Sequence, residues 1–238
     1  MKKHIPNTIT CCNLISGCIA IVYALHFNAQ MALLFIIVGA VFDFFDGMSA
    51  RLLGVSSDIG KELDSLADDV TFGVAPSAVI FAELSVLDYP TFLDGMPAVM
   101  ALLPYLAFIV AAFSAVRLAK FNLDTRQTTS FIGLPTPANA LFWASFIISM
   151  GDLMANLAYN VNILLLLIFL SCWILIAEVP MFALKFKEFS FAHNKIRYLF
   201  IITGIILIAL FLVIDKSIAG IWMTIIWYII LSLISNRK

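Results

Sequence analysis

Eight long apolar segments, separated by short polar or Pro- and Gly-containing turns, dominate this 238-residue chain. A helix of roughly 20 apolar residues crosses the hydrocarbon core of a bilayer, and each segment is near that length. Hydrophobic residues make up 63% of the chain and charged residues 12%, which excludes an ordinary soluble domain. We therefore predict an all-α integral membrane protein of about eight transmembrane helices, near residues 9–28, 31–51, 62–83, 98–120, 133–151, 161–184, 198–214 and 218–235.

Lys and Arg residues are distributed very unevenly over the predicted connections. If the N-terminus lies inside, every Lys and Arg except Lys216 falls on the cytoplasmic side. Short cytoplasmic loops carry this excess in membrane proteins. We therefore predict a protein of the cell (cytoplasmic) membrane, with both termini and any site near these loops facing the cytoplasm. The net charge of -1 gives no basis for a nucleic-acid partner.

Four aspartates lie within the cytoplasmic halves of the second and third predicted helices. They belong to one spaced pattern, D-x2-D-G-x2-A-R-x8-G-x3-D-x3-D, formed by Asp43, Asp46, Gly47, Ala50, Arg51, Gly60, Asp64 and Asp68. Ionisable groups in spanning segments cost roughly 2.5 to 3.5 kcal/mol each on insertion scales. Such a cluster therefore indicates a functional site, an ion path or a proton relay.

Helical geometry places these residues on two surfaces. At about 100° of rotation per residue, the first two aspartates share a face with Gly47 and Ala50, and the last two share a face with Gly60. A short cytoplasmic turn makes the two helices antiparallel neighbours, so the two pairs of carboxylates can face each other. The small residues let a ligand or a second backbone approach closely, and plain helix packing would use them equally.

Four convergent carboxylates with no His or Cys nearby form an oxygen-only site. Such a site favours Mg²⁺, Mn²⁺ or Ca²⁺ over zinc or copper. Two divalent ions would balance four carboxylates, and the same ions could clamp a diphosphate. Arg51, near the cytoplasmic end of its helix, suits a phosphate oxygen. It would serve equally well as a positive-inside anchor of the helix.

The complete pattern resembles the signature of the CDP-alcohol phosphotransferase family, whose eight fixed positions are all matched here. The resemblance implies a six-helix core with an internal polar cavity open to the cytoplasm, usually in a homodimer. On this basis residues 1–238 form a single membrane domain. Its catalytic core would be residues 1–184, and residues 185–238 would add two transmembrane helices to that core.

Within the family, the chain is most similar to the integral-membrane phosphatidylserine synthases, over roughly its first 140 residues. The similarity lies in IPNTIT at 5–10 with Asn13 and Gly17, in DSLAD at 64–68 followed by FGVAP at 72–76, and in FIGLPTPA at 131–138. Members that use glycerophosphate tend to carry Arg where this chain has Asn13. The resemblance implies transfer of the phosphatidyl group of CDP-diacylglycerol to the hydroxyl of L-serine, which gives phosphatidylserine and CMP.

The same resemblance implies roles for individual residues. Asp43, Asp46 and Asp64 are expected to bind divalent metal, and Asp68 to lie near a second ion and act as the general base. The residues expected to contact the CDP-lipid are Pro6, Asn7, Asp46, Gly47, Ala50, Arg51 and Gly60. The cationic candidates for binding the serine carboxylate are Arg117, Lys120 and Arg126.

Two other functions fit parts of the sequence. An enzyme that transfers the same group to glycerol 3-phosphate or inositol phosphate would need a stronger basic pocket, which Arg117, Lys120 and Arg126 could supply. A divalent-cation channel or carrier also places aspartates between helices. However, all four signature aspartates lie in cytoplasmic halves, and no second acidic cluster continues the path outward. We therefore favour the enzyme with serine as the acceptor.

Overall fold

The computed structural model describes residues 4–90, 93, 95–124, 130–157, 159–183 and 194–235. Its α-helices are α1 (His4–Leu25), α2 (Ala29–Leu53), α3 (Asp58–Asp68), α4 (Ala75–Val86), α5 (Pro97–Leu102), α6 (Ile109–Leu123), α7 (Thr136–Ala155), α8 (Asn160–Ile176), α9 (Lys195–Ile214) and α10 (Ala219–Ser235). A π-helix, η1 (Asp69–Val74), joins α3 to α4, and a 3-10 helix, η3 (Leu103–Phe108), joins α5 to α6. Each predicted apolar segment therefore contains a helix, and the all-α class is confirmed.

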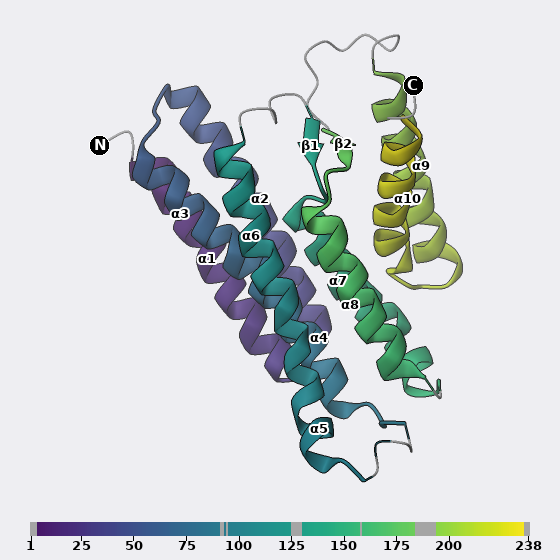
Figure 1. Ribbon diagram of the computed structural model, residues 1–238. Coiled ribbons are helices and arrows are strands. Elements are labelled where there is room, and N and C mark those ends of the chain that lie inside the picture. Colours follow the sequence, from purple (N-terminus) through teal and green to yellow (C-terminus); the bar gives the residue numbers. More distant parts are fainter. Residues whose placement is uncertain are drawn as a thin grey trace.

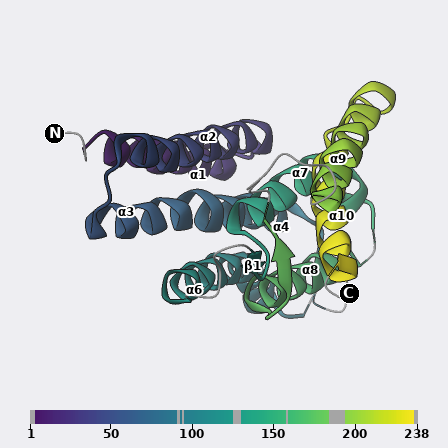
Figure 2. The ribbon, with the colours of Figure 1, turned by 90° about the horizontal axis from the view of Figure 1, so that it is seen from above.

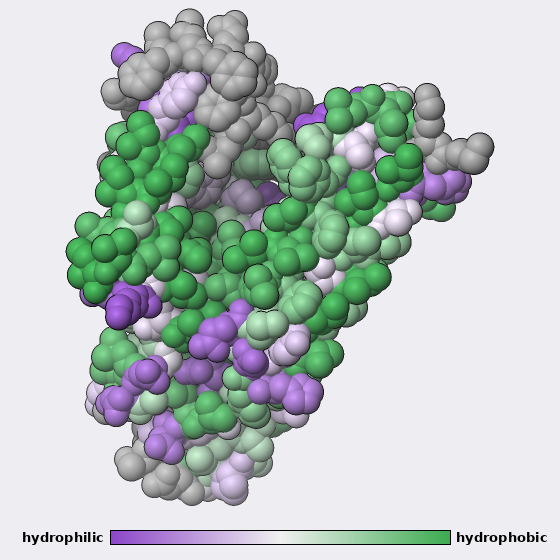
Figure 3. Space-filling model, turned by 180° about the vertical axis from the view of Figure 1, so that it is seen from behind, coloured by the Kyte–Doolittle hydropathy of each residue, from purple (hydrophilic) through white to green (hydrophobic). Residues whose placement is uncertain are grey.

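Six of the described helical stretches are long and apolar enough to cross a membrane. In two of them, α3 runs through η1 into α4, and α5 runs through η3 into α6. The remaining two, α8 and α10, are shorter apolar helices of 17 residues each. In Figure 3, hydrophobic side chains cover much of the visible face, as contact with lipid tails requires.

The helices run up and down, so that α1 begins and α10 ends at the same end of the molecule as the turn between α2 and α3 (Figure 1). α1 packs against α2, α3 and α4, while α7 contacts α2 and α4. Seen from above, α9 and α10 lie to one side of the other helices (Figure 2). α10 joins this pair to the other helices, because it packs against both α9 and α7.

The apolar core surrounds Trp143 of α7, which is fully buried. Its indole Nε1 donates a hydrogen bond to the Ser171 hydroxyl at 3.0 Å, and Ser171 donates to Asn139 Oδ1 at 2.7 Å. The Trp143 and Ser171 donors are both paired, which lowers the cost of placing them in an apolar interior. These hydrogen bonds tie α7 to α8.

The sixth predicted segment, 161–184, is too long. α8 ends at Ile176, and Pro180–Phe182 forms a short strand, β2, antiparallel to β1 (Ser130–Ile132). Pro180 lacks a backbone N–H and disfavours helical geometry in the residue before it, so the apolar run continues without the helix. This two-stranded pair is a feature that hydrophobicity did not predict.

Gly133 makes the turn between β1 and α7 possible. Its φ is +77°, and a Cβ built there would collide with the Leu175 carbonyl. Gly54 also has a positive φ, +62°, but no atom lies within 4 Å of its Cβ position. We expect Gly133→Ala to lower the free energy of unfolding by about 1–3 kcal/mol, and Gly54→Ala by less, because only the first adds a collision to backbone strain. Thermal unfolding in detergent measures the stability of both variants. An equal loss of stability in the two would contradict the role of the Leu175 contact.

Candidate active site

Three of the four signature aspartates converge between α2 and α3. Carboxylate oxygens of Asp43, Asp64 and Asp68 all lie within 4.8 Å of one another, and the three side chains are half-buried. Asp43 comes from α2, while Asp64 and Asp68 lie one turn apart on α3. We call these three residues the aspartate trio.

Asp46 occupies a separate position beside the trio. Only 6% of its surface is exposed, and its Oδ2 accepts a hydrogen bond from the Thr10 hydroxyl at 2.6 Å. Thr10 also lies 3.1 Å from the Pro6 carbonyl, so it links Asp46 to the first turn of α1. Within the described part of the chain, Asp46 is not among the residues whose carboxylates cluster closely enough to share one ion.

Asp68 is oriented by α1. The fully buried Asn13 donates from Nδ2 to Asp68 Oδ1 at 3.1 Å. The backbone carbonyl of Asn13 in turn accepts from the Thr71 hydroxyl at 3.1 Å, which fixes α1 against η1. A π-turn widens a helix and often occurs at functional sites. Here it begins directly after Asp68.

The donor set of the trio fits a hard divalent cation. All of its ligand atoms are carboxylate oxygens, which suit Mg²⁺, Mn²⁺ and Ca²⁺. Asp64 Oδ1 is buried and has no hydrogen-bond partner among the described residues. A buried carboxylate oxygen without a partner is costly, and a cation beside it would remove that cost.

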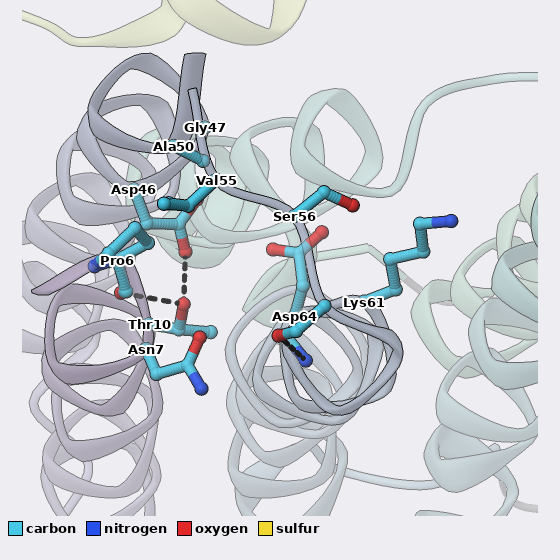
Figure 4. A pocket seen from close by; sticks show the side chains of 12 residues that line it. Pro6, Asn7, Thr10, Asp46, Gly47, Ala50, Val55, Ser56, Lys61 and Asp64 are labelled. Atoms are coloured by element: carbon cyan, nitrogen blue, oxygen red, sulfur yellow. Dashed lines mark hydrogen bonds between the residues drawn. The ribbon is translucent and has the colours of Figure 1, made fainter. Parts of the chain in front are cut away.

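A cavity of about 170 Å³ opens beside Asp46, between α1, α2 and α3 (Figure 4). Asp46 and Thr10 lie on one side of it and Asp64 on the other, whereas Lys61 extends away. It brings together six of the seven residues that the sequence predicted to contact a CDP-lipid, namely Pro6, Asn7, Asp46, Gly47, Ala50 and Gly60. We call this the first cavity.

Two glycines shape the first cavity in different ways. A Cβ on Gly60 would lie 2.9 Å from Ser57 Oγ and 3.1 Å from Asn7 Oδ1, so Gly60 is needed for close packing. A Cβ on Gly47 would meet no protein atom within 4 Å. Packing therefore does not require glycine at position 47. Space for a ligand next to the helix would explain why glycine occupies this position.

A second cavity, of about 410 Å³, lies beside the trio. It is lined by all three trio residues, by Arg51 and by Arg117, and it shares Gly47 and Asp64 with the first cavity. Arg51, the seventh residue predicted to contact the CDP-lipid, is therefore in this second cavity. The two cavities adjoin at Gly47 and Asp64, so Asp64 of the trio lines both.

Arg117 and Lys120, two of the three predicted serine-binding residues, have different surroundings in the structure. Arg117 of α6 is only 6% exposed, lines the second cavity, and has no hydrogen-bond partner for Nη2 among the described residues. The rings of Phe121 and Phe131 lie 5.3 and 5.9 Å from its guanidinium carbon. Lys120 is exposed and does not line the second cavity, although it shares a further cavity with Arg117, and Arg126 lies outside the described residues.

The family model for CDP-alcohol phosphatidyltransferases matches residues 3–180. The chain belongs to this family. A CDP-diacylglycerol–serine O-phosphatidyltransferase of Helicobacter pylori is 34% identical over 235 residues, covering 84% of this chain and 93% of the relative. Proteins of the same name from Bacillus subtilis and Saccharomyces cerevisiae are 43% and 40% identical over 57% and 56% of this chain, and over 70% and 50% of those relatives.

Three residues in the site of this phosphatidyltransferase had no role assigned from the sequence. Thr10 and Asn13 hold Asp46 and Asp68, and the fully buried Thr136 lines the second cavity with no partner for its hydroxyl among the described residues. All three lie in or beside the segments that resemble phosphatidylserine synthases. The signal available in the sequence was a polar residue within or next to a long apolar segment. That signal does not identify the side chain with which each polar residue would interact.

Proposed function

We propose that this integral membrane protein transfers the phosphatidyl group of CDP-diacylglycerol to the hydroxyl of L-serine, which gives phosphatidylserine and CMP. One observation carries the proposal: the aspartate trio and Arg117 line one cavity, and this cavity adjoins, at Asp64 and Gly47, the cavity lined by the residues expected to bind the CDP-lipid. The names of the relatives supply the acceptor, L-serine.

The first cavity holds the CDP end of the donor in this proposal. Pro6, Asn7, Ala50 and Gly60 form walls against the nucleotide, and Gly47 lets the diphosphate approach the helix backbone. Arg51 reaches the diphosphate from the second cavity and balances the charge of its oxygens.

The signature aspartates bind divalent metal in this proposal, with the trio as the principal site and Asp46 next to it. Mg²⁺ or Mn²⁺ is the expected ion, with Ca²⁺ a third candidate and two ions in all. Bound metal would neutralise the diphosphate and the charge that develops on CMP as it leaves. The chain's own contribution is to hold four carboxylates beside that diphosphate, and Thr10 and Asn13 fix two of them, Asp46 and Asp68.

Asp68 acts as the general base. A serine hydroxyl is a poor nucleophile at neutral pH, so a carboxylate must take its proton as the oxygen attacks phosphorus. The new bond joins the serine oxygen to the lipid-linked phosphorus, the bond from that phosphorus to CMP breaks, and the proton passes to Asp68. The hydrogen bond from Asn13 keeps one oxygen of Asp68 in place during this step.

Serine binds in the second cavity, with its carboxylate on Arg117. Of the three cations considered, Arg117 shares a cavity with the trio and is shielded from solvent, which strengthens its attraction for a carboxylate. Lys120 and Arg126 are weaker candidates and fit cytoplasmic anchors equally well.

Arg117→Lys should raise the KM for serine by about 10- to 100-fold, the size of one charge-assisted hydrogen bond. Lysine keeps the charge and loses the planar fork that binds a carboxylate through two bonds. The KM for CDP-diacylglycerol should change by less than about twofold, and Lys120→Ala is the matched control at a cation outside this cavity. Steady-state kinetics measure both constants. An unchanged serine KM in Arg117→Lys would remove Arg117 from the serine site.

We further propose that the protein resides in the cytoplasmic membrane with its termini and active site facing the cytoplasm, and that it works as a homodimer. The catalytic unit is residues 1–184, followed by the two additional helices at 185–238. The charge asymmetry of the loops supports the orientation.

The alternatives make different demands on the site. Glycerol 3-phosphate or inositol phosphate carries a dianionic group, whereas Arg117 is the one buried cation that lines the second cavity within the described residues. A cation carrier would need acidic groups along the whole path, and the trio is confined to α2 and α3. Both features favour serine transfer.

The direct test uses purified protein in vesicles containing CDP-diacylglycerol, with isotopically labelled serine. The proposal predicts a labelled phospholipid whose formation stops on chelation of divalent ions and resumes on addition of Mg²⁺ or Mn²⁺. The proposal would be contradicted if the protein binds CDP-diacylglycerol but incorporates no label into phospholipid with either Mg²⁺ or Mn²⁺.

A further inference from the structure

The site described so far does not use the C-terminal hairpin, α9 and α10, yet a continuous set of contacts leads from this hairpin to Arg117. We propose that the C-terminal hairpin positions the guanidinium of Arg117 through Tyr228 and the β1–β2 pair, so that the hairpin sets the affinity for the acceptor. The part of this inference that concerns the acceptor rests on the proposed function.

Two aromatic rings pack against Arg117. Its guanidinium carbon lies 5.3 Å from the ring of Phe121, on its own helix, and 5.9 Å from the ring of Phe131 of β1, and these two ring centroids are 6.0 Å apart. An arginine that stacks on aromatic rings keeps its plane only where the rings stay in place. The position of β1 therefore decides the orientation of the guanidinium.

β1 is placed by β2. Phe131 is directly opposite Met181 in the antiparallel pair, so the two side chains share one face. Met181 is almost fully buried in a cluster that also contains Phe200, Tyr228 and Leu231. Burial of Met181 against the hairpin therefore fixes the register of the β1–β2 pair and, with it, the position of Phe131.

β2 is in turn fixed by the hairpin. The Tyr228 hydroxyl donates a hydrogen bond to the Phe182 carbonyl oxygen at 2.9 Å. The Phe182 ring packs edge-on against the rings of Tyr228 and Phe200, with ring centroids 4.8 and 5.6 Å apart. The buried ring and hydroxyl of Tyr228 thus connect α10 to β2.

The test uses Tyr228→Phe, which removes the hydrogen bond to Phe182 and keeps the ring. The matched control is Thr203→Val, which removes the acceptor of the 2.8 Å hydrogen bond from Trp227 within the same hairpin but does not touch β2. The first measurement is the rate at which phenylglyoxal modifies Arg117 in the full-length protein, followed by mass spectrometry. We expect modification to be severalfold faster in Tyr228→Phe and unchanged in Thr203→Val.

The second measurement is steady-state kinetics. Tyr228→Phe should raise the serine KM about three- to tenfold, as loss of one hydrogen bond would, with kcat and the KM for CDP-diacylglycerol within about twofold of the wild type. If Tyr228→Phe lowers the melting temperature more than Thr203→Val does, Phe131→Leu tests the same contact from β1 and should give the same two effects.

Unchanged reactivity of Arg117 in both Tyr228→Phe and Phe131→Leu would overturn the inference, and so would an equal rise in the KM of both substrates. Failure of the proposed function would look different. A wild-type protein that does not use serine refutes serine transfer, whereas the modification rates still decide whether the hairpin positions Arg117.

Discussion

Asp68→Asn should lower kcat by about 10²- to 10⁴-fold, the usual contribution of a general base, while CDP-diacylglycerol still binds. Asparagine has nearly the same shape and can still pair with Asn13, but it cannot accept the proton of the serine hydroxyl. Steady-state turnover and nucleotide binding, measured on the same preparation, separate the two effects.

The matched control for this variant is Asp69→Asn, the same change one residue further along the chain. Asp69 lies at the start of η1, outside the aspartate trio, with a carboxylate oxygen next to Gly73. We expect its turnover to stay within about threefold of the wild type, because surface and packing changes away from the reacting atoms have small effects. Near-normal turnover of Asp68→Asn would show that another group takes the proton.

The second large effect is expected at Gly47. Gly47→Leu should abolish binding of CDP-diacylglycerol, and Gly47→Ala should weaken it, because the added side chain enters the space at the junction of the two cavities. Both variants should fold. Replacing a glycine inside a helix by alanine stabilises by roughly 0.5–1 kcal/mol where no clash arises, so Gly47→Ala should unfold at a slightly higher temperature than the wild type.

Opposite changes in stability and affinity are the distinctive result at this position. Titration of detergent-solubilised protein with CDP-diacylglycerol and thermal unfolding measure them together. Gly60→Ala is the comparison, because its Cβ would press on Ser57 and Asn7 and should therefore cost stability as well. Wild-type affinity in Gly47→Leu would mean that the lipid nucleotide does not approach α2 at this point.

Apolar length predicted every helical segment, because the bilayer imposes a length of about 20 residues on a spanning helix. It failed at residues 177–183, since an apolar sequence does not distinguish α8 from the strand after it. Helical spacing likewise placed the aspartates on faces of α2 and α3. It could not tell that Asp46 pairs with Thr10 while Asp43 joins Asp64 and Asp68, because that depends on how α1 is rotated against α2.

The serine site was the least predictable part from sequence. Arg117, Lys120 and Arg126 looked alike as cations near the end of one apolar segment. The difference between Arg117 and Lys120 is burial and a shared cavity with the trio, and it arises from contacts of Arg117 with residues such as Phe131, which is 14 residues away in the sequence. Such contacts follow from tertiary packing, which no local pattern encodes.

The most direct test of serine transfer is the release of CMP by the purified protein. It would be given CDP-diacylglycerol and Mg²⁺ or Mn²⁺, with serine, glycerol 3-phosphate, inositol phosphate or no acceptor. We predict release that depends on both the metal and serine, and little release with the other acceptors. Release with glycerol 3-phosphate or inositol phosphate alone would contradict serine as the acceptor. No release under any condition, together with divalent-cation flux in proteoliposomes, would contradict the enzyme itself.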